Sequence, residues 1–154
     1  MPGPPRSGRE SCLAWGCCER SDSIGRITTA GAITEYAVPT ANSVPSSIAA
    51  GSDGALWFTE NGGQKIGRIT TAGAISEYPL PNANANPDGM AEGPDGAVWF
   101  IEQAQVGRIT TSGTIVSYPL ASAATDSING MVTGPDGAVW FTERVGNAIV
   151  RVAP

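Results

Sequence analysis

The feature that most constrains the fold of this 154-residue sequence is an internal repeat of about 42 residues. The segment GSDGALWFTE begins at Gly51, and close copies of it begin at Gly93 and Gly134, at steps of 42 and 41 residues. A second motif, IGRITTAG, begins at Ile24 and recurs at similar steps before it fades at the C-terminus. Repeats of this length are typical of propellers and solenoids, in which one small unit is stacked many times.

Each unit carries four runs that have the composition of β-strands. In the second unit these runs are Ser47–Ala50, Ala55–Glu60, Ile66–Thr71 and Ala74–Leu80. Asp53 and Gly54 separate the first two runs, and this dipeptide favours a two-residue hairpin turn with positive φ at both positions. A Thr-Ala-Gly turn at 71–73 separates the last two runs.

The repeat predicts an all-β fold made of β-propeller blades, each with four antiparallel strands, about three and a half blades in total. A solenoid or a β-sandwich built of repeats is the competing architecture. Gly and Pro make up 32 of the 154 residues, which argues against long helices. In a propeller, the Trp and Phe of each WF pair are expected to pack between neighbouring blades. The predicted blade units span 23–43, 44–85, 86–126 and 127–154.

Residues 1–22 differ from the other units and are interpreted as a degenerate or mis-started segment. All three cysteines, Cys12, Cys17 and Cys18, lie here, and their spacing does not match the paired spacing of a zinc site. One hypothesis is that the segment is a frame-shifted reading of a longer repeat gene. The missing motif in another reading frame of the DNA would support this hypothesis.

Charge and composition exclude several classes of function. The net charge is −5, Lys65 is the single lysine, and the arginines are scattered, so we expect no nucleic-acid partner. No stretch approaches the length of a membrane span and no signal peptide is recognisable, so we expect no membrane partner and a cytoplasmic location. The sequence holds no histidine, which excludes an imidazole base or ligand for the chain acting alone.

The repeat resembles that of the virginiamycin B lyases, also called streptogramin B lyases. The resemblance covers about residues 23–154 and is carried by GPDGAVWFTE followed by IGRITTxGxIxxYPL. It implies a seven-bladed propeller and a Mg²⁺-dependent lyase that opens cyclic depsipeptide antibiotics of the streptogramin B type by elimination at the ester. Such an elimination needs a base, a cation for the enolate-like charge and an acid for the leaving oxygen.

The same resemblance implies where the site residues lie. Family histidines follow the proline that starts the innermost strand, and the matching positions here are Ser46, Asp88 and Asn129. Ser46 and Asn129 are therefore candidates for substrate binding, and Asp88 is the candidate base, although it also fits a turn residue. The family's metal-binding carboxylate resembles the glutamate that closes each WFTE-type run, which makes Glu60, Glu102 and Glu143 the candidate ligands of Mg²⁺.

Strand pairing inferred from the residues alone also brings these candidates together, at one rim of the propeller. With a two-residue turn, Ser47 faces Glu60, Gly89 faces Glu102, and Gly130 faces Glu143. Consecutive blades then bring the three glutamates to one rim, where a hard cation would relieve their repulsion. The alternative is that each glutamate accepts hydrogen bonds from backbone between blades. We expect the aspartate of each Asp-Gly pair to lie in a hairpin turn: Asp53, Asp95 and Asp136. We expect the arginines of the IGRI runs to be solvated or to contact neighbouring blades: Arg26, Arg68 and Arg108.

Three and a half blades leave open strand edges, so we expect self-association that completes a propeller ring. The first functional hypothesis is a lyase-like propeller without the catalytic histidines, which is inactive alone but able to take a small cyclic depsipeptide. The alternative is a non-catalytic propeller that binds a ligand, metal or protein on its rim. A decayed gene product with poor solubility is the third possibility.

Overall fold

The computed structural model describes residues 22–103, 105–120, 128–143 and 146–153. These residues form only strands and connections, and none of them belongs to a helix that could cross a membrane. The three cysteines lie outside the described residues.

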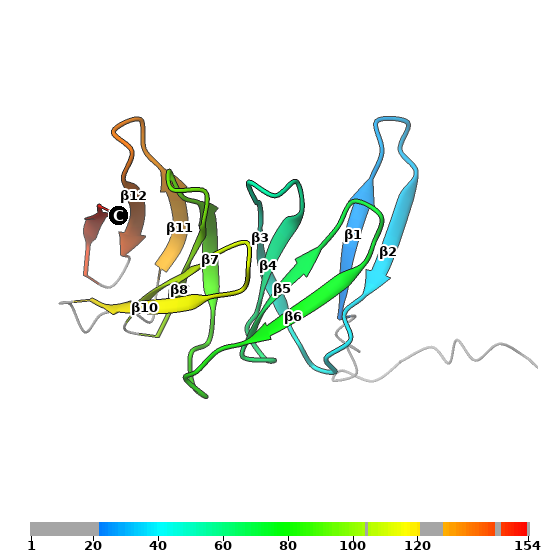
Figure 1. Ribbon diagram of the computed structural model, residues 1–154, viewed down its shortest axis with the longest axis horizontal. Helices are drawn as coiled ribbons and strands as arrows, with labels where there is room; N and C mark the ends of the chain where they lie inside the picture. Colours follow the sequence, from blue (N-terminus) through cyan, green and yellow to red (C-terminus); the bar gives the residue numbers. More distant parts are fainter. Residues whose placement is uncertain (1–21, 104, 121–127, 144–145, 154) are drawn as a thin grey trace, which may run out of the picture.

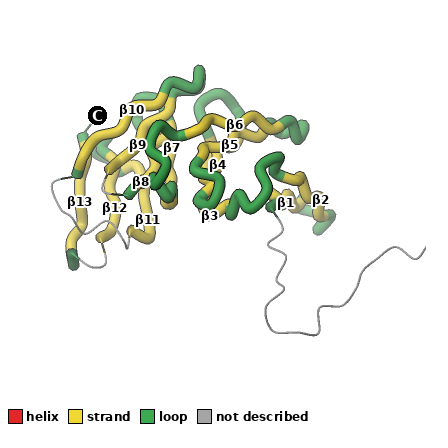
Figure 2. Tube along the Cα trace, turned by 90° about the horizontal axis from the view of Figure 1, so that it is seen from below, coloured by secondary structure: helices red, strands yellow, loops and turns green. Residues whose placement is uncertain are grey.

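Four antiparallel sheets follow one another along the chain in an arc (Figures 1 and 2). We call them blades 1 to 4. Blade 1 contains β1 (Ser23–Ile27) and β2 (Ile33–Ala37); blade 2 contains β3 (Pro45–Ala50), β4 (Leu56–Glu60), β5 (Lys65–Ile69) and β6 (Ile75–Pro79); blade 3 contains β7 (Asp88–Glu92), β8 (Val98–Glu102), β9 (Gln105–Ile109) and β10 (Ile115–Pro119); blade 4 contains β11 (Ile128–Thr133), β12 (Val139–Glu143) and β13 (Ala148–Val152). The predicted fold class, all-β with four-stranded antiparallel blades of a partial propeller, is confirmed.

The first hairpin turn of each blade differs from the prediction. In blade 2, the Gly51 N–H donates to the Ala55 carbonyl at 2.9 Å, so the loop has three residues rather than two. Only Gly54 in this loop has positive φ, at 74°. The Asp53 carboxylate accepts the Ala55 N–H at 3.2 Å, and this local bond favours a turn that leaves the aspartate at negative φ.

This longer turn shifts the register, so the predicted facing pairs of Ser47, Gly89 and Gly130 with the glutamates are wrong. In blade 2, Glu60 pairs with Pro45, and a bulge separates this pair from the next one, Ile48 with Phe58. The first pairs of β7 and β11 are Asp88 with Ile101 in blade 3 and Ile128 with Glu143 in blade 4. The Thr59 hydroxyl fills the bulge in blade 2, where it accepts the Ser47 N–H at 3.0 Å.

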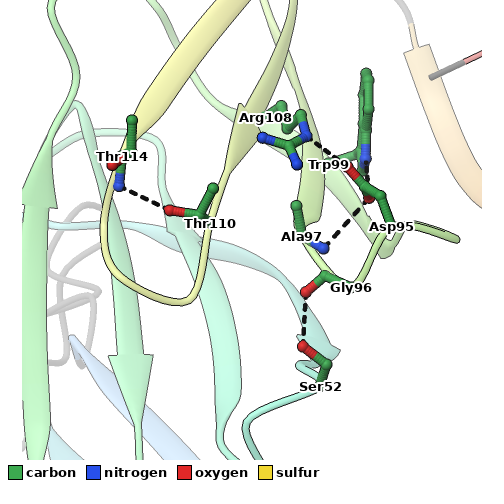
Figure 3. Close-up of polar contacts among 8 residues, drawn as sticks. All are labelled: Ser52, Asp95, Gly96, Ala97, Trp99, Arg108, Thr110 and Thr114. Carbon is green, nitrogen blue, oxygen red and sulfur yellow. Dashed lines mark hydrogen bonds and ion pairs between the residues drawn. The ribbon is translucent and has the colours of Figure 1, made fainter.

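The turn aspartates also hold the blade together (Figure 3). Asp95 accepts the Ala97 N–H and the Trp99 Nε1–H at 3.3 and 3.1 Å, and its other oxygen accepts the Arg108 Nε–H at 2.6 Å. Asp53 and Asp136 occupy the same position in blades 2 and 4, as the sequence predicted. The prediction for Arg68 and Arg108 is wrong because each pairs with the aspartate of its own blade. Arg26 instead donates to a carbonyl of the next blade, that of Thr71.

The core lies between blades, and the two aromatic residues of each WF pair face opposite neighbours. Phe58 packs with Ile24 and Val38 of the preceding blade region, whereas Trp57 packs with Val98 and Phe100 of the following blade. Successive residues of a strand point to opposite faces of the sheet, which explains this division. The expectation that Trp and Phe form the packing between blades is confirmed.

Candidate functional site

The innermost strands β3, β7 and β11 lie side by side, so their first residues gather on one inner rim. Ser46 is exposed here, with its Oγ 2.9 Å from the Thr59 hydroxyl and 3.4 Å from the Pro87 carbonyl that it donates to. Asn61 also donates to that carbonyl, at 3.3 Å. The structure therefore brings Ser46 of blade 2 next to the start of the strand that carries Asp88.

The backbone before this rim is strained. Val44, directly before Pro45, has a φ of 49°, a conformation that a β-branched residue adopts only under constraint. The constraint comes from Asp22, whose carboxylate accepts the N–H groups of Asn42 and Val44 at 2.6 and 3.1 Å. These backbone bonds, that of Val44 foremost, hold the pKa of Asp22 below its ordinary value. Asn86 repeats the conformation in blade 3 with a φ of 42°, which asparagine tolerates better.

Glu60 ends β4 as predicted, but it is fully buried and neither carboxylate oxygen has a hydrogen-bond partner. Its surroundings contain the Lys65–Glu77 ion pair at 2.9 Å and the carboxylate of Asp22. Burial is the main cause that raises the pKa of Glu60 to about 7, and repulsion from Glu77 adds to the shift while Lys65 opposes it. Glu60 is therefore a carboxyl group that is readily protonated near neutral pH.

The other two candidate ligands are also buried. One oxygen of Glu102 accepts the Ser117 hydroxyl at 2.6 Å, and the other has no partner. Glu143 is 4% exposed at the end of β12. Within the described part of the chain, no three Asp, Glu, His or Cys side chains are grouped closely enough to hold a metal ion.

The remaining candidates lie at the starts of strands. Asp88 begins β7 and is exposed, opposite Ile101 rather than Glu102. Asn129 lies in β11, but its side chain is outside the described residues.

Sequence reasoning missed the polar cluster around Glu60. Lys65 donates to the Glu77 carboxylate and, at 2.6 Å, to the Thr40 hydroxyl, and Glu77 also accepts the Thr40 N–H at 3.0 Å. The Ser43 hydroxyl is buried without a partner in the same connection. One signal was available in the sequence, because Lys65 is its only lysine and Glu77 is replaced by Ser117 in the next repeat.

The fold and the repeated inner-rim positions define the class of protein, a partial β-propeller. The sequence profile of the virginiamycin B lyase family matches residues 7–154, and the chain belongs to this family. No curated protein matches the sequence significantly.

Three solved structures agree with this assignment. A streptogramin B lyase structure superposes with a TM-score of 0.82 at 40% identity, over 86% of this chain and 45% of that one. Virginiamycin B lyase from Staphylococcus aureus gives a TM-score of 0.77 at 39% identity, over 86% and 49%. The third structure is a catalytically inactive variant of that enzyme with quinupristin, in which one histidine is replaced by alanine. Its TM-score is 0.78 at 40% identity, over 86% of this chain and 48% of that one. The chain thus spans less than half the length of each.

Proposed function

We propose that this chain is a virginiamycin B lyase-like propeller segment that binds a cyclic depsipeptide of the streptogramin B type at its inner rim without opening it. The observation that carries the proposal is the absence of histidine from the whole sequence, together with the hydrogen bonds of the Ser46 hydroxyl. The Ser46 hydroxyl is held by Thr59 and the Pro87 carbonyl, and a hydroxyl so placed has no adjacent imidazole to activate it.

One similar structure holds a ligand in an inactive protein. The S. aureus variant with one histidine replaced by alanine is catalytically inactive, and its structure is one with quinupristin. By analogy, the exposed Asp88 and the Ser46 region of this chain offer polar contacts on a rim of family geometry. Binding without chemistry is therefore the function that the present residues support best.

The described residues do not fit a Mg²⁺ site. Mg²⁺ prefers an octahedron of oxygen ligands with water and one or two accessible carboxylates. Glu60 and Glu102 are buried in separate blades, and no described group of three ligands surrounds either one. The proposed function accordingly contains no metal step.

Calorimetric titration with quinupristin tests the proposal, followed by chromatography of the recovered ligand with and without Mg²⁺. We expect saturable binding and ligand of unchanged retention time. Retention time is the necessary readout, because elimination gives an isomer of the same mass.

Asp88→Arg should weaken binding at least about tenfold, since it places a long cation on the rim. The matched control is Glu92→Arg at the other end of β7, where the side chain is also exposed. Absence of binding, or a linear product, would overturn the proposal.

A further inference from the structure

Blades 1 and 4 form the two ends of the arc (Figure 1), and they expose apolar side chains whose equivalents the internal blades bury. We call Ile27 and Ile33 of blade 1 the N-terminal face, and Val132, Trp140 and Ile149 of blade 4 the C-terminal face. Exposed apolar clusters on a soluble domain mark sites of association.

Repeat equivalence shows how unusual these exposures are. Ile27 is 68% exposed, whereas Ile69 and Ile109 at the same position in blades 2 and 3 are 3% and 0% exposed. At the other end, Ile149 is 72% exposed, whereas its equivalents Ile66 and Val106 are fully buried. The side chains are of the same kind in every case, so the difference in exposure comes from the lack of a neighbouring blade among the described residues.

The interface between blades 2 and 3 shows what each face packs against. Trp57 and Ile66 of blade 2, the equivalents of Trp140 and Ile149, share one core cluster with Ile109 of blade 3, and Ile115 packs against it. Ile109 and Ile115 are the equivalents of Ile27 and Ile33. A face of the C-terminal kind therefore packs against a face of the N-terminal kind inside this same molecule.

Two further features show that no described residue covers either face. The C-terminal face contains an apolar hollow of about 300 Å³ lined by Val132, Trp140 and Ile149 among others. In the internal blades, a tyrosine of the preceding blade lies against the glycine of the outer turn, Tyr36 on Gly73 and Tyr78 on Gly113. At the equivalent Gly31 of blade 1, an added Cβ atom would have nothing within 4 Å.

We propose that a second copy of this chain docks head to tail, with the C-terminal face of one copy on the N-terminal face of the other. The occupant is a second copy because the equivalents of Trp57 and Ile66 on the C-terminal face and those of Ile109 and Ile115 on the N-terminal face lie at opposite ends of the arc (Figure 1). The contact is heterologous, so each docked copy keeps one free face, and association continues until a ring closes or a chain of copies forms.

Sedimentation velocity over a series of concentrations tests the proposal with the full chain. We expect a mass above 15.7 kDa that rises with concentration. Ile27→Asp and Ile149→Asp should each weaken association at least about a hundredfold, because each places a charge in an apolar contact. Both side chains are exposed in the single chain, so the fold should survive, which circular dichroism checks. Val116→Asp is the matched control, since Val116 is 42% exposed but lies in the internal blade 3.

An equimolar mixture of Ile27→Asp and Ile149→Asp gives the decisive result. The first variant keeps its C-terminal face and the second keeps its N-terminal face, so the mixture should form a heterodimer that grows no further. Loss of association in Ile149→Asp alone would show a symmetric contact between C-terminal faces and overturn the proposal. A wild-type chain that stays monomeric, or association that only Val116→Asp disrupts, would overturn it as well.

Discussion

Internal and terminal blades contain the same motif in different environments. Trp57 and Trp99 are 0% and 2% exposed because a following blade covers each of them, whereas Trp140 of the last blade is only partly buried. All three donate Nε1–H to the aspartate of their own turn, so the local structure is identical. The repeat sequence thus determines the blade, and the neighbouring blade determines the burial, as expected when stability is a sum of nearest-neighbour terms.

The largest expected contrast comes from truncating one isoleucine position in two blades. Ile109→Ala should lower the free energy of unfolding by about 2–5 kcal/mol, because it opens a cavity between blades 2 and 3. Ile27→Ala at the equivalent exposed position should change it by less than about 0.5 kcal/mol. Urea denaturation at low protein concentration measures both. Equal losses would show that blade 1 is covered in solution and would remove the distinction between internal and terminal blades.

A second contrast concerns pH and the buried carboxyl group between blades 1 and 2. Burial raises the pKa of Glu60 to about 7, so the folded protein holds this proton over a range in which the unfolded chain releases it. Stability should therefore fall as pH rises from about 4.5 to 7, by about 3 kcal/mol, and change little from this group above pH 7. Glu77, Lys65 and Asp22 surround the group and set the extent of the shift.

Glu60→Gln isolates that effect, because the amide keeps the shape and removes the titration. The variant should match the wild type most closely at pH 4 and be more stable than the wild type at pH 8. Thermal unfolding at the two pH values measures the difference. A wild-type advantage at pH 8 would mean that the ionised carboxylate is stabilised in solution, contrary to its unpartnered oxygens.

The sequence alone predicted the blade, the strand runs and the aromatic packing, because all three follow from periodicity and residue type. It failed at the register of Glu60, because the extra loop residue Ser52 and a bulge after Pro45 each move the strand pairing by one position. A dipeptide such as Asp53-Gly54 fits two turn lengths, and the choice depends on the bond from Ala55 N–H to the aspartate. Local pattern cannot resolve such competing turns.

The candidate site was harder to predict than the fold. Placing Glu60 at a strand end was correct, but its raised pKa depends on burial and on charges that include Asp22, which lies 38 positions earlier in the chain. The strain at Val44 was equally hidden, because its cause is that same distant carboxylate. Properties that arise from contacts between repeats cannot be predicted from the sequence of a single repeat.

Glycine substitutions sharpen the comparison between blades at a finer scale. Gly107 lies under the ring of Phe100, where an added Cβ would lie 2.2 Å from ring carbons. Gly107→Ala should therefore cost about 1–3 kcal/mol through overpacking. Gly25 is the equivalent in blade 1 with nothing within 4 Å, and Gly25→Ala should stabilise by about 0.5–1 kcal/mol by restricting the unfolded chain. Melting temperatures of the two variants should move in opposite directions; shifts of the same sign would refute the difference in packing.

The smallest effect should come from the ion pair of the turn. Asp95→Asn keeps an oxygen for the Trp99 and Ala97 donors but removes the charge that faces Arg108. Because both side chains are about a quarter exposed, the loss should be about 0.5–1 kcal/mol and should shrink in high salt. The more exposed pair of Asp136 and Arg151 makes Asp136→Asn the matched terminal variant, with a smaller change. Chemical denaturation in low and high salt separates the two, and an equal, salt-independent loss would show that the aspartates act only as hydrogen-bond acceptors within the turn.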